Sequence, residues 1–434
     1  MKLTSWGNYP KAEARSFSAT CYDEIKTILQ DNSTLITQGN SRSYGDSAFA
    51  RTVIDMKTID CFLSFDSLTG IISCQSGVLL VDILETIIPQ GWILPVLPGT
   101  QLITVGGAIA SDVHGKNHHQ IGAFSQFVKS IKIMDGRGNI SICSNNKNKK
   151  LFHASCGGMG LTGVILEATI QLLPVKSNKI TQTVIKADNL QQLFAAFEDN
   201  TSSPYSVAWV DCLAKGRALG KGLLMLGKHE NKHNKTSSLD YKYTSRFKMA
   251  FNLPAFVLSS FTVRLFNWFY YYTASENSKT VTLQKFFFPL DSIVDWNKMY
   301  GKKGFVQYQF VLPLEHSLEG MTAILTRIAE SKQGSFLTVL KRMGKANDRL
   351  LSFPMEGYSL ALDFRINPKV LALLDELDAI VVKYQGRIYL CKDARMSLKT
   401  FNQGYPQAEK FRKLRKNLKL DQKFQSQQAQ RLNL

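Results

Sequence analysis

The chain has 434 residues, more than one hydrophobic core usually organises, so its length predicts two domains. With 44% hydrophobic and 20% charged residues the composition is that of a globular protein, which excludes a largely disordered or fibrous chain. Lysine and arginine outnumber aspartate and glutamate by 53 to 34, a formal net charge of +19 that favours an anionic partner such as a nucleic acid, an acidic membrane or a phosphorylated substrate.

The first third of the chain predicts short strands separated by glycine-bearing turns, as in an α+β fold. The runs LITQGN, TVIDM and GIISCQSG carry this pattern of β-forming residues and turn glycines. Between the first two lies QGNSRSYGDS, residues 38–47, where two glycines accompany an arginine and several serines. Arg42 beside hydroxyl groups and freed backbone amides is a candidate cradle for an anion.

Residues 79–90 carry apolar side chains at helical spacing and are followed by Gly91, which predicts a helix packed on these strands. The next segment, residues 95–119, reads PVLPGTQLITVGGAIASDVHGKNHH and is dense in glycine. Glycines let the backbone approach a bulky ligand closely, and loops with exposed N–H groups suit a pyrophosphate. The segment is therefore a second candidate ligand loop.

The histidines and the cysteines of the chain are potential metal ligands, but neither set predicts a metal site. His114, His118 and His119 lie close together, but Asp112 is the only further ligand type nearby in sequence. The seven cysteines are scattered, odd in number and without a CxxC pair, which argues against zinc and against a disulfide framework. We expect no metal, and cysteines that are reduced thiols in a cytoplasmic protein.

A hairpin and a long strand are predicted before residue 175. SIKIMDGRGNISIC, residues 130–143, places Asp-Gly and Gly-Asn between two β-rich runs. Residues 158–163 satisfy GxGxxG, but they precede GVILEATIQLLPV, whose two-residue period predicts a strand that ends at Pro174. A helix and a later acidic residue would be needed for an NAD-type Rossmann site, so that site is not expected.

Residues 250–273, AFNLPAFVLSSFTVRLFNWFYYYT, are rich in aromatic and aliphatic side chains. Pro254, Arg264 and several polar residues interrupt the stretch, so it does not predict a spanning helix. It suits either a helix in the headgroup layer of a membrane or a buried core helix. The basic charge of the chain favours membrane contact.

The later part of the chain differs in its sequence pattern, with long segments that mix polar and apolar residues, such as QYQFVLP. We expect a second domain that extends to about residue 386. The last segment carries the strand-like GRIYLC and a basic helix, EKFRKLRKNLKL, and could return to the first domain.

Six motifs occur in the order and approximate spacing of one enzyme family: QGNSRSYGDS, PVLPGTQLITVGGAIASDVHGKNHH, SCGGMGLTGVILEATI, QYQFVLP, LTVLKRMG and GRIYLCKDAR. In these motifs the chain resembles the decaprenylphosphoryl-β-D-ribose 2-oxidase family. The resemblance covers nearly the full length and is weakest at about residues 215–280. HGKNHH together with RSYGDS is specific to this branch, whereas the glycines alone indicate the wider flavin-oxidase superfamily.

The resemblance implies an α+β, two-domain FAD-binding fold of the p-cresol methylhydroxylase type, also called vanillyl-alcohol-oxidase-like. Its FAD-binding domain would span residues 1–177, an antiparallel-sheet substrate domain 178–386, and a segment returning to the FAD domain 387–434. Many relatives tether FAD through a histidine in the first loop, but no histidine occurs between Thr34 and Met56, so FAD is expected to be non-covalent. The residues implied for the cofactor site are Gly39, Ser41, Arg42, Ser43, Tyr44, Gly45, Asp46, Gly99, Thr104, Val105, Gly106, Gly107, Ser111, His114, Val164 and Tyr389.

The implied reaction is oxidation of the 2-hydroxyl of a polyprenylphosphoryl-β-D-ribose to the 2-keto form. This would be the first half of an epimerisation that an NADH-dependent keto-reductase partner completes, at the inner membrane, with the protein peripheral on its cytoplasmic side. The implied catalytic residues are Lys392, His114 and Tyr389. The implied substrate-binding residues are Tyr44, Trp209, Gln307, Gln309, Lys341, Ser359 and Lys392.

The chemistry can also be argued without the resemblance. Oxidation of a secondary alcohol needs a hydride acceptor and a base for the hydroxyl proton, and a lysine beside the flavin would stabilise the anionic reduced ring. Lys392 and His114 are both candidate bases, and the sequence leaves the choice open.

The chain departs from the family pattern at one position of the substrate pocket. Two other functions were also considered. Ala361 occupies a position where the family has a cysteine, so inhibitors that bond to that thiol should fail here. Within the same superfamily, a soluble sugar-alcohol or aldonolactone oxidase using O2 is the alternative. A nucleic-acid-binding protein is not expected, because the basic residues are spread along the chain and no RRM, KH or zinc-finger signature occurs.

Overall fold

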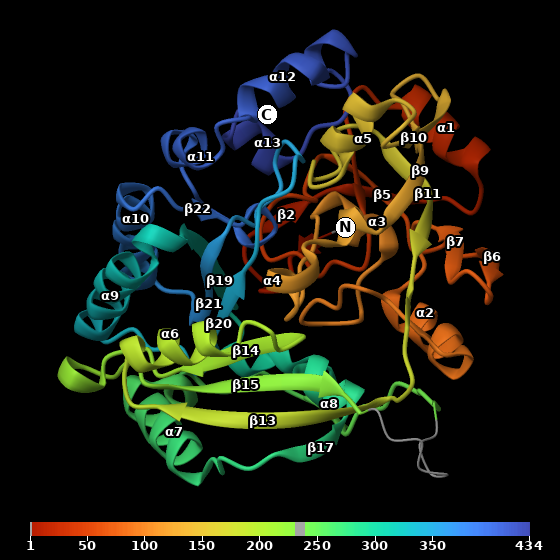
Figure 1. Ribbon diagram of the computed structural model, residues 1–434. Helices are drawn as coiled ribbons and strands as arrows, with labels where there is room; N and C mark the ends of the chain where they lie inside the picture. Colours follow the sequence, from red (N-terminus) through yellow and green to blue (C-terminus); the bar gives the residue numbers. More distant parts are fainter. Residues whose placement is uncertain (1, 231–238) are drawn as a thin grey trace.

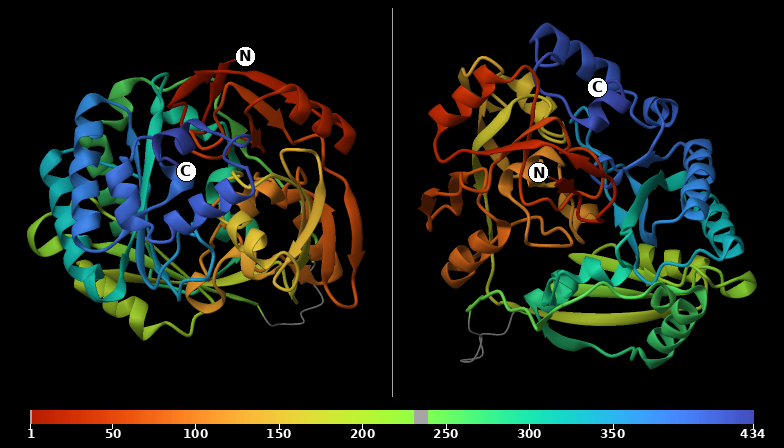
Figure 2. Two further views of the ribbon diagram at one scale, coloured as in Figure 1. Left: turned by 90° about the horizontal axis from the view of Figure 1, so that it is seen from above. Right: turned by 180° about the vertical axis from the view of Figure 1, so that it is seen from behind.

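The computed structural model describes residues 2–230 and 239–434, and the chain folds into two parts that lie side by side (Figure 1). In the view from above in Figure 2, the part built from the start of the chain lies on one side and the part built from later residues on the other.

The first part holds a parallel three-stranded sheet and an antiparallel five-stranded sheet. The parallel sheet has the order β3 (Arg15–Ser18), β5 (Thr52–Asp55), β4 (Ile36–Gln38). The antiparallel sheet has the order β10 (Ile140–Ser144), β9 (Val128–Met134), β11 (Val164–Gln171), β7 (Ile71–Gln75), β6 (Phe62–Asp66). The accompanying elements are α1 (Tyr22–Asp31), α2 (Leu80–Ile87), α3 (Val105–Ala110), α4 (His118–Ile121), α5 (Lys149–Ser155) and the strand pairs β1 (Lys2–Thr4) with β2 (Lys11–Glu13) and β8 (Trp92–Ile93) with β12 (Leu173–Pro174).

The second part is organised by an eight-stranded sheet. Its order is β17 (Lys279–Thr282), β13 (Lys179–Ala187), β15 (Gly222–His229), β14 (Tyr205–Val210), β20 (Thr338–Met343), β21 (Gly357–Arg365), β19 (Phe305–Pro313), β22 (Arg387–Ile388). Its helices are α6 (Leu190–Asp199), α7 (Ser260–Thr273), α8 (Leu283–Phe287), α9 (Leu314–Ser331) and α10 (Pro368–Lys383), and a short parallel pair is formed by β16 (Phe247–Lys248) and β18 (Ile293–Val294). The chain ends with α11 (Leu398–Gly404), α12 (Ala408–Asn417) and α13 (Gln427–Arg431).

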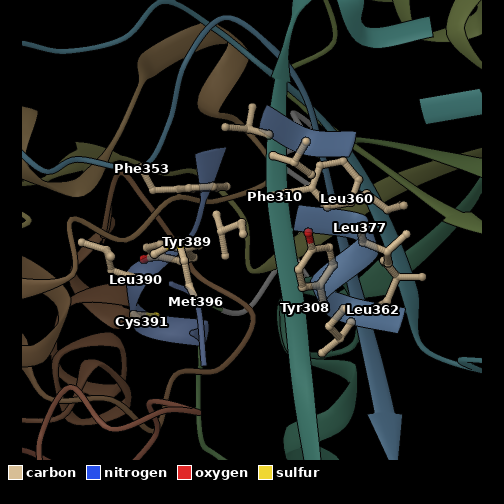
Figure 3. Close-up of a cluster of buried hydrophobic side chains, with 14 of the residues drawn as sticks. Tyr308, Phe310, Phe353, Leu360, Leu362, Leu377, Tyr389, Leu390, Cys391 and Met396 are labelled. Atoms are coloured by element: carbon tan, nitrogen blue, oxygen red, sulfur yellow. The ribbon is translucent and has the colours of Figure 1, made fainter. Parts of the chain in front are cut away.

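Strand periodicity gives the eight-stranded sheet two different faces. Residues such as Tyr308, Phe310, Leu360 and Leu362 point to one face, where they form the largest core cluster with α6, α9 and α10 (Figure 3). Their neighbours along the same strands point to the opposite face, which lines a cavity described below. A strand buried on both faces is usually apolar throughout, so polar residues on this second face indicate a functional surface.

Several local predictions are confirmed. Residues 130–143 form the hairpin of β9 and β10, and α2 with the following single-turn helix ends at Gly91, whose φ of 81° is the left-handed conformation that glycine adopts readily. The strand after the GxGxxG pattern is β11, which ends at Gln171 rather than at Pro174. A strand there, instead of a helix, agrees with the expectation of no Rossmann site.

The aromatic stretch at residues 250–273 is not a buried core helix, so that interpretation is wrong. Only Val263, Asn267 and Tyr271 of α7 are buried, and Phe261 is 74% exposed. No helix in the described ranges has the length and apolar character needed to cross a bilayer.

The division at residues 177 and 386 stays a prediction. The strands of the eight-stranded sheet run from Lys179 to Ile388, while the end of the chain contacts both parts. Phe424 forms a bridge with Leu35 of the first part, and β22 pairs with β19 of the second.

Candidate active site

A cavity of roughly 730 Å³ lies between the glycine-bearing loops of the first part and the polar face of the eight-stranded sheet. This volume is in the range of cofactor and small-molecule sites. We call residues 37–44 and 97–107 the loop wall, and we call β19, β20, β21 and residues 389–392 the strand wall. Residues 110–116 add His114 and Lys116 to the lining.

The loop wall is shaped by glycines that approach neighbouring segments closely. A Cβ atom on Gly39 would stand 2.2 Å from Thr104 Oγ1, and one on Gly106 would stand 3.0 Å from the Cβ of Ser76. Thr104 caps α3 by accepting a hydrogen bond from Gly107 N, at 3.1 Å. The loops therefore stay packed together while they expose their backbone to the cavity.

Three buried polar atoms of cavity-lining residues have no hydrogen-bond partner among the residues that the structure describes. They are Arg42 Nε, Ser76 Oγ and His114 Nδ1. Buried polar groups are normally satisfied, so unpaired ones on a cavity wall indicate a ligand. These polar groups, together with the glycine loops and the volume of the cavity, fit a large polar cofactor such as FAD.

His114 contacts the strand wall through a buried hydrogen-bond network. Gln309 Nε2 donates to His114 Nε2 at 3.0 Å and to Ser359 Oγ at 3.2 Å. Burial, together with the charge of Lys341, holds the pKa of His114 well below its usual range, so the ring is neutral. Because Nε2 accepts from Gln309, the ring proton lies on Nδ1, a buried donor without a partner among the residues that the structure describes.

Five lysines line the cavity, and three of them, Lys116, Lys341 and Lys392, are partly buried. Lys392 Nζ lies 4.1 Å from the ring centre of Tyr44, and Lys116 Nζ donates to the carbonyl of Phe286. Burial and the charge of Lys392 lower the pKa of Lys341 to about 8. Burial and the charge of Lys341 lower the pKa of Lys116 to about 7. The lysines therefore destabilise one another's charged forms, as in a site built for an anion.

A buried carboxyl group holds Gln307. Gln307 Nε2 donates to Asp363 at 2.6 Å, and the Tyr300 hydroxyl donates to the same side chain at 3.4 Å. Burial raises the pKa of Asp363 to about 7, although the amide and the nearby charge of Lys392 oppose the rise. Asp363 thereby fixes the orientation of the Gln307 amide group. The Oε1 atom of Gln307 then remains as a hydrogen-bond acceptor.

The position of Lys392 depends on contacts from several segments. Arg431 Nη2 lies 2.7 Å from Asp46 and 2.8 Å from Asp393, so it ties α13 to the segment just after residues 37–44 and to the residue after Lys392. The Tyr389 hydroxyl donates to the carbonyl of Ser111 at 2.9 Å. Figure 3 shows Tyr389 beside Phe353, and their ring centres lie 4.5 Å apart. Lys392 is thus held by packed, hydrogen-bonded neighbours.

The structure brings most of the predicted residues together. The predicted residues that line the cavity are Gly39, Ser41, Arg42, Ser43, Tyr44, Gly99, Thr104, Gly106, Gly107, Ser111, His114, Trp209, Gln307, Gln309, Lys341, Tyr389 and Lys392. Those that lie behind the lining are Gly45, Asp46, Val105, Val164 and Ser359. Of these, Asp46 pairs with Arg431, Ser359 accepts from Gln309, and Val164 belongs to a hydrophobic core, so their roles in ligand binding stay predictions.

Sequence reasoning did not assign a role to Lys116 or Asp363. Lys116 lies inside the motif HGKNHH, and Asp363 follows Ser359 and Ala361 at two-residue spacing on the cavity face of β21. Strand periodicity could have found Asp363. Cys391, which precedes Lys392 in the chain, lines the cavity, as does Ala361.

Comparison with known proteins agrees with this geometry. Residues 18–144 match a family of FAD-binding domains. A decaprenylphosphoryl-β-D-ribose oxidase from Mycolicibacterium smegmatis is 34% identical over 100% of this chain and 97% of its own length. The chain belongs to this oxidase family. It is an FAD-dependent oxidoreductase, and the predicted α+β, FAD-binding fold is confirmed.

Other relatives of the oxidase are more distant or uncharacterised. An uncharacterised Streptomyces coelicolor protein is 30% identical over 81% of this chain and 98% of its own length. A D-arabinono-1,4-lactone oxidase from Candida glabrata is 23% identical over 47% of this chain and 40% of its own length. The lactone oxidases therefore resemble only part of the chain.

Proposed function

We propose that the protein oxidises the 2-hydroxyl of a polyprenylphosphoryl-β-D-ribose to a 2-keto sugar. The observation that carries the proposal is one cavity that combines FAD-fitting loops with Lys392, Lys341, Gln307 and Gln309. The amide groups can bind sugar hydroxyls, and the lysines suit a phosphorylated substrate. The name of the full-length Mycolicibacterium relative supports the same substrate class.

Bound FAD supplies the acceptor for the hydride that leaves carbon 2 of the sugar. The charge of Lys392 stabilises negative charge that develops beside it, and the ring of Tyr44 holds its ammonium group in place. The Nε2 atom of His114 already accepts a hydrogen bond from Gln309, so His114 has no free acceptor for the hydroxyl proton. We therefore assign the role of proton acceptor to Lys392 in its amine form. The hydroxyl proton passes to Nζ as the hydride leaves carbon 2, which leaves a carbonyl at carbon 2 and gives the ammonium group whose charge stabilises the reduced cofactor.

FAD binds without a covalent bond in this proposal. The loop wall contains no histidine, and His114 is engaged with Gln309. Acid precipitation should therefore release the flavin into the supernatant. Flavin that remains in the pellet would contradict this point while leaving the FAD site intact.

The product is a keto sugar, and an NADH-dependent keto-reductase would complete an epimerisation. We place the protein on the cytoplasmic side of the inner membrane as a peripheral protein. The exposed aromatic residues of α7 and the net charge of +19 support contact with an anionic lipid surface.

The test is anaerobic reduction of the bound flavin by farnesylphosphoryl-β-D-ribose. Bleaching of the flavin absorbance should accompany the formation of a ketone, which borodeuteride reduction labels at carbon 2 for mass spectrometry. Xylitol and an aldonolactone are the comparison substrates. Bleaching by these two but not by the phosphorylated ribose would replace the proposal with the soluble oxidase alternative.

A further inference from the structure

The motif HGKNHH has a structural explanation that points to Lys116. Its residues are anchored to three separate segments. Asn117 Nδ2 donates to the carbonyl of Pro95 at 2.8 Å, and His118 Nδ1 accepts from Gly344 N at 3.0 Å. The backbone of Lys116 accepts from Ser206 N at 2.9 Å. The polar residues that follow Lys116 therefore fix its position at the cavity.

Lys116 and Lys341 differ from Lys392 in their electrostatic surroundings. Lys392 lies near enough to Asp363 to lower the pKa of that carboxyl group. For Lys116 and Lys341, the only nearby charges that affect the pKa are those of other lysines. Neither forms an ion pair with a carboxylate within the ranges 2–230 and 239–434. Both side chains are partly buried, and a cation that is removed from water without a counterion is costly, so their retention in a cavity wall indicates an anionic ligand.

The ammonium group of Lys116 also has unused donors. It carries three N–H groups, and one of them donates to the carbonyl of Phe286. Lys341 makes no side-chain hydrogen bond to any residue that the structure describes, and both side chains line the cavity. Together they offer several N–H donors and two charges to one ligand, the combination that a phosphate group binds well.

The proposed substrate carries its phosphate close to the reacting atom. The phosphorus is joined to carbon 1 through one oxygen, only three bonds from carbon 2, whose hydroxyl is oxidised. The phosphate must therefore bind close to Lys392. Lys341 is near enough to Lys392 for that charge to lower its pKa, and Lys116 is near enough to Lys341 for the same effect. Lys279 and Lys285 also line the cavity, but both are exposed and act as ordinary surface charges.

We propose that Lys116 and Lys341 form a clamp for the phosphate of the lipid-linked sugar. This inference rests on the proposed function and adds a specificity determinant to it. The clamp binds the phosphate, positions carbon 2 against the flavin and excludes sugars that lack a phosphate. Lys392 remains available to the hydroxyl.

The test compares farnesylphosphoryl-β-D-ribose with a phosphate-free farnesyl β-D-riboside. The wild-type enzyme should prefer the phosphorylated compound in kcat/KM. Lys116→Met should reduce this preference roughly ten- to a hundred-fold, the usual effect of one charged hydrogen bond, and Lys341→Met should act in the same direction. Lys285→Met removes an exposed cavity lysine and should leave the preference unchanged.

A binding measurement separates this inference from the proposed function. Calorimetric titration of the flavin-loaded protein with farnesyl phosphate needs no oxidation, and Lys116→Met should weaken the binding by a similar factor. Unaltered preference and unaltered farnesyl phosphate binding in Lys116→Met, with flavin content retained, would overturn the clamp. Failure of the wild type to oxidise either riboside would instead overturn the proposed function.

A second variant guards against a folding defect. Lys116→Arg keeps the charge and should retain most of the phosphate preference, whereas Lys116→Gln keeps a polar side chain without the charge and should lose it. Equal preference in these two variants would show that the charge of residue 116 has no role in phosphate binding.

Discussion

The two walls of the cavity differ in the groups that they present. The loop wall exposes glycines and backbone, and Arg42 is the only charged residue in its sequence. The strand wall presents Gln307, Gln309, Lys341 and Lys392 on the polar face of a sheet whose other face is core. The matched family of FAD-binding domains ends at residue 144 and so includes the whole loop wall and none of the strand wall. We therefore expect backbone shape in the loop wall to serve the cofactor and side chains of the strand wall to serve the substrate.

The largest expected effect comes from the strand wall. Lys392→Met should lower kcat by about 10²- to 10³-fold, because it removes the charge beside the reacting atoms, while FAD stays bound. Anaerobic flavin reduction in rapid mixing would measure the loss. Lys399→Met, at an exposed position on α11, is the matched control. A variant at residue 392 that keeps kcat within threefold of wild type would remove this lysine from the chemistry.

A change in the loop wall should act on the cofactor instead. In Gly39→Val the new Cβ would collide with Thr104 Oγ1, and the two loops would have to separate. We expect the Kd for FAD to rise at least about tenfold, or 1.4 kcal/mol. The ratio of flavin to protein absorbance would report it. Adding Thr104→Ala should restore part of the flavin, and a Gly39→Val protein that purifies with full flavin would show that the close approach is unnecessary.

The walls should also differ in their response to pH. Lys116 and Lys341, with pKa values lowered to about 7 and about 8, lose their charge as the pH rises through this range. A phosphate favours the charged amines, so its affinity is greatest below pH 7 and should fall several-fold between pH 7 and pH 9. Asp363, with a pKa raised to about 7, becomes anionic over the same range and adds to the fall.

Calorimetry with farnesyl phosphodiesters, which do not titrate in this range, would measure the dependence. FAD affinity should change less, because the pKa of His114 is far below this window and that of Tyr44 is far above it. The phosphate-free riboside isolates the contribution of Asp363. Phosphodiester binding that stays constant from pH 7 to pH 9 would mean that neither lysine contacts the phosphate.

The sequence predicted the two walls to different extents. Glycines in QGNSRSYGDS and in residues 95–119 mark the loop wall directly, because few other residues allow such close backbone contacts. The residues of the strand wall were predicted from the family resemblance, because nothing in the sequence around Gln307 or Lys341 indicates a binding site. No role was predicted for Lys116, because the histidines near it in the sequence suggested metal binding. In the structure Asn117 and His118 instead anchor the backbone next to Lys116.

Other features depend on contacts that only the folded chain shows. Asp46 was expected at the cofactor because it lies in the first loop, yet it pairs with Arg431, which is 385 residues away in sequence. No sequence pattern indicates an ion pair between residues so far apart in the chain. The orientation of residues 250–273 was equally undetermined, because amphipathic surface helices and core helices share the same composition.

The smallest expected effect concerns the exposed face of α7, which lies outside both walls. Phe261, Trp268 and Phe269 are each more than half exposed, and exposed Lys242, Arg246 and Lys248 precede the helix. Replacing the three aromatic residues with serine should reduce binding to phosphatidylglycerol vesicles several-fold, because aromatic side chains insert at the headgroup layer. Co-sedimentation would measure it, and kcat with a short-chain substrate should stay unchanged.

The control for α7 is another exposed apolar residue. Leu68 is 91% exposed in the turn between β6 and β7, far in sequence from the basic residues near α7. Leu68→Ser should leave vesicle binding intact if binding is localised to α7, and high salt should weaken the binding of the wild type. Equal losses in both variants would indicate unspecific adsorption. Unchanged vesicle binding in the triple variant would place any membrane contact elsewhere on the protein. The role of α7 would then be limited to the cavity, which its residues Phe266 and Tyr270 line beside Trp209.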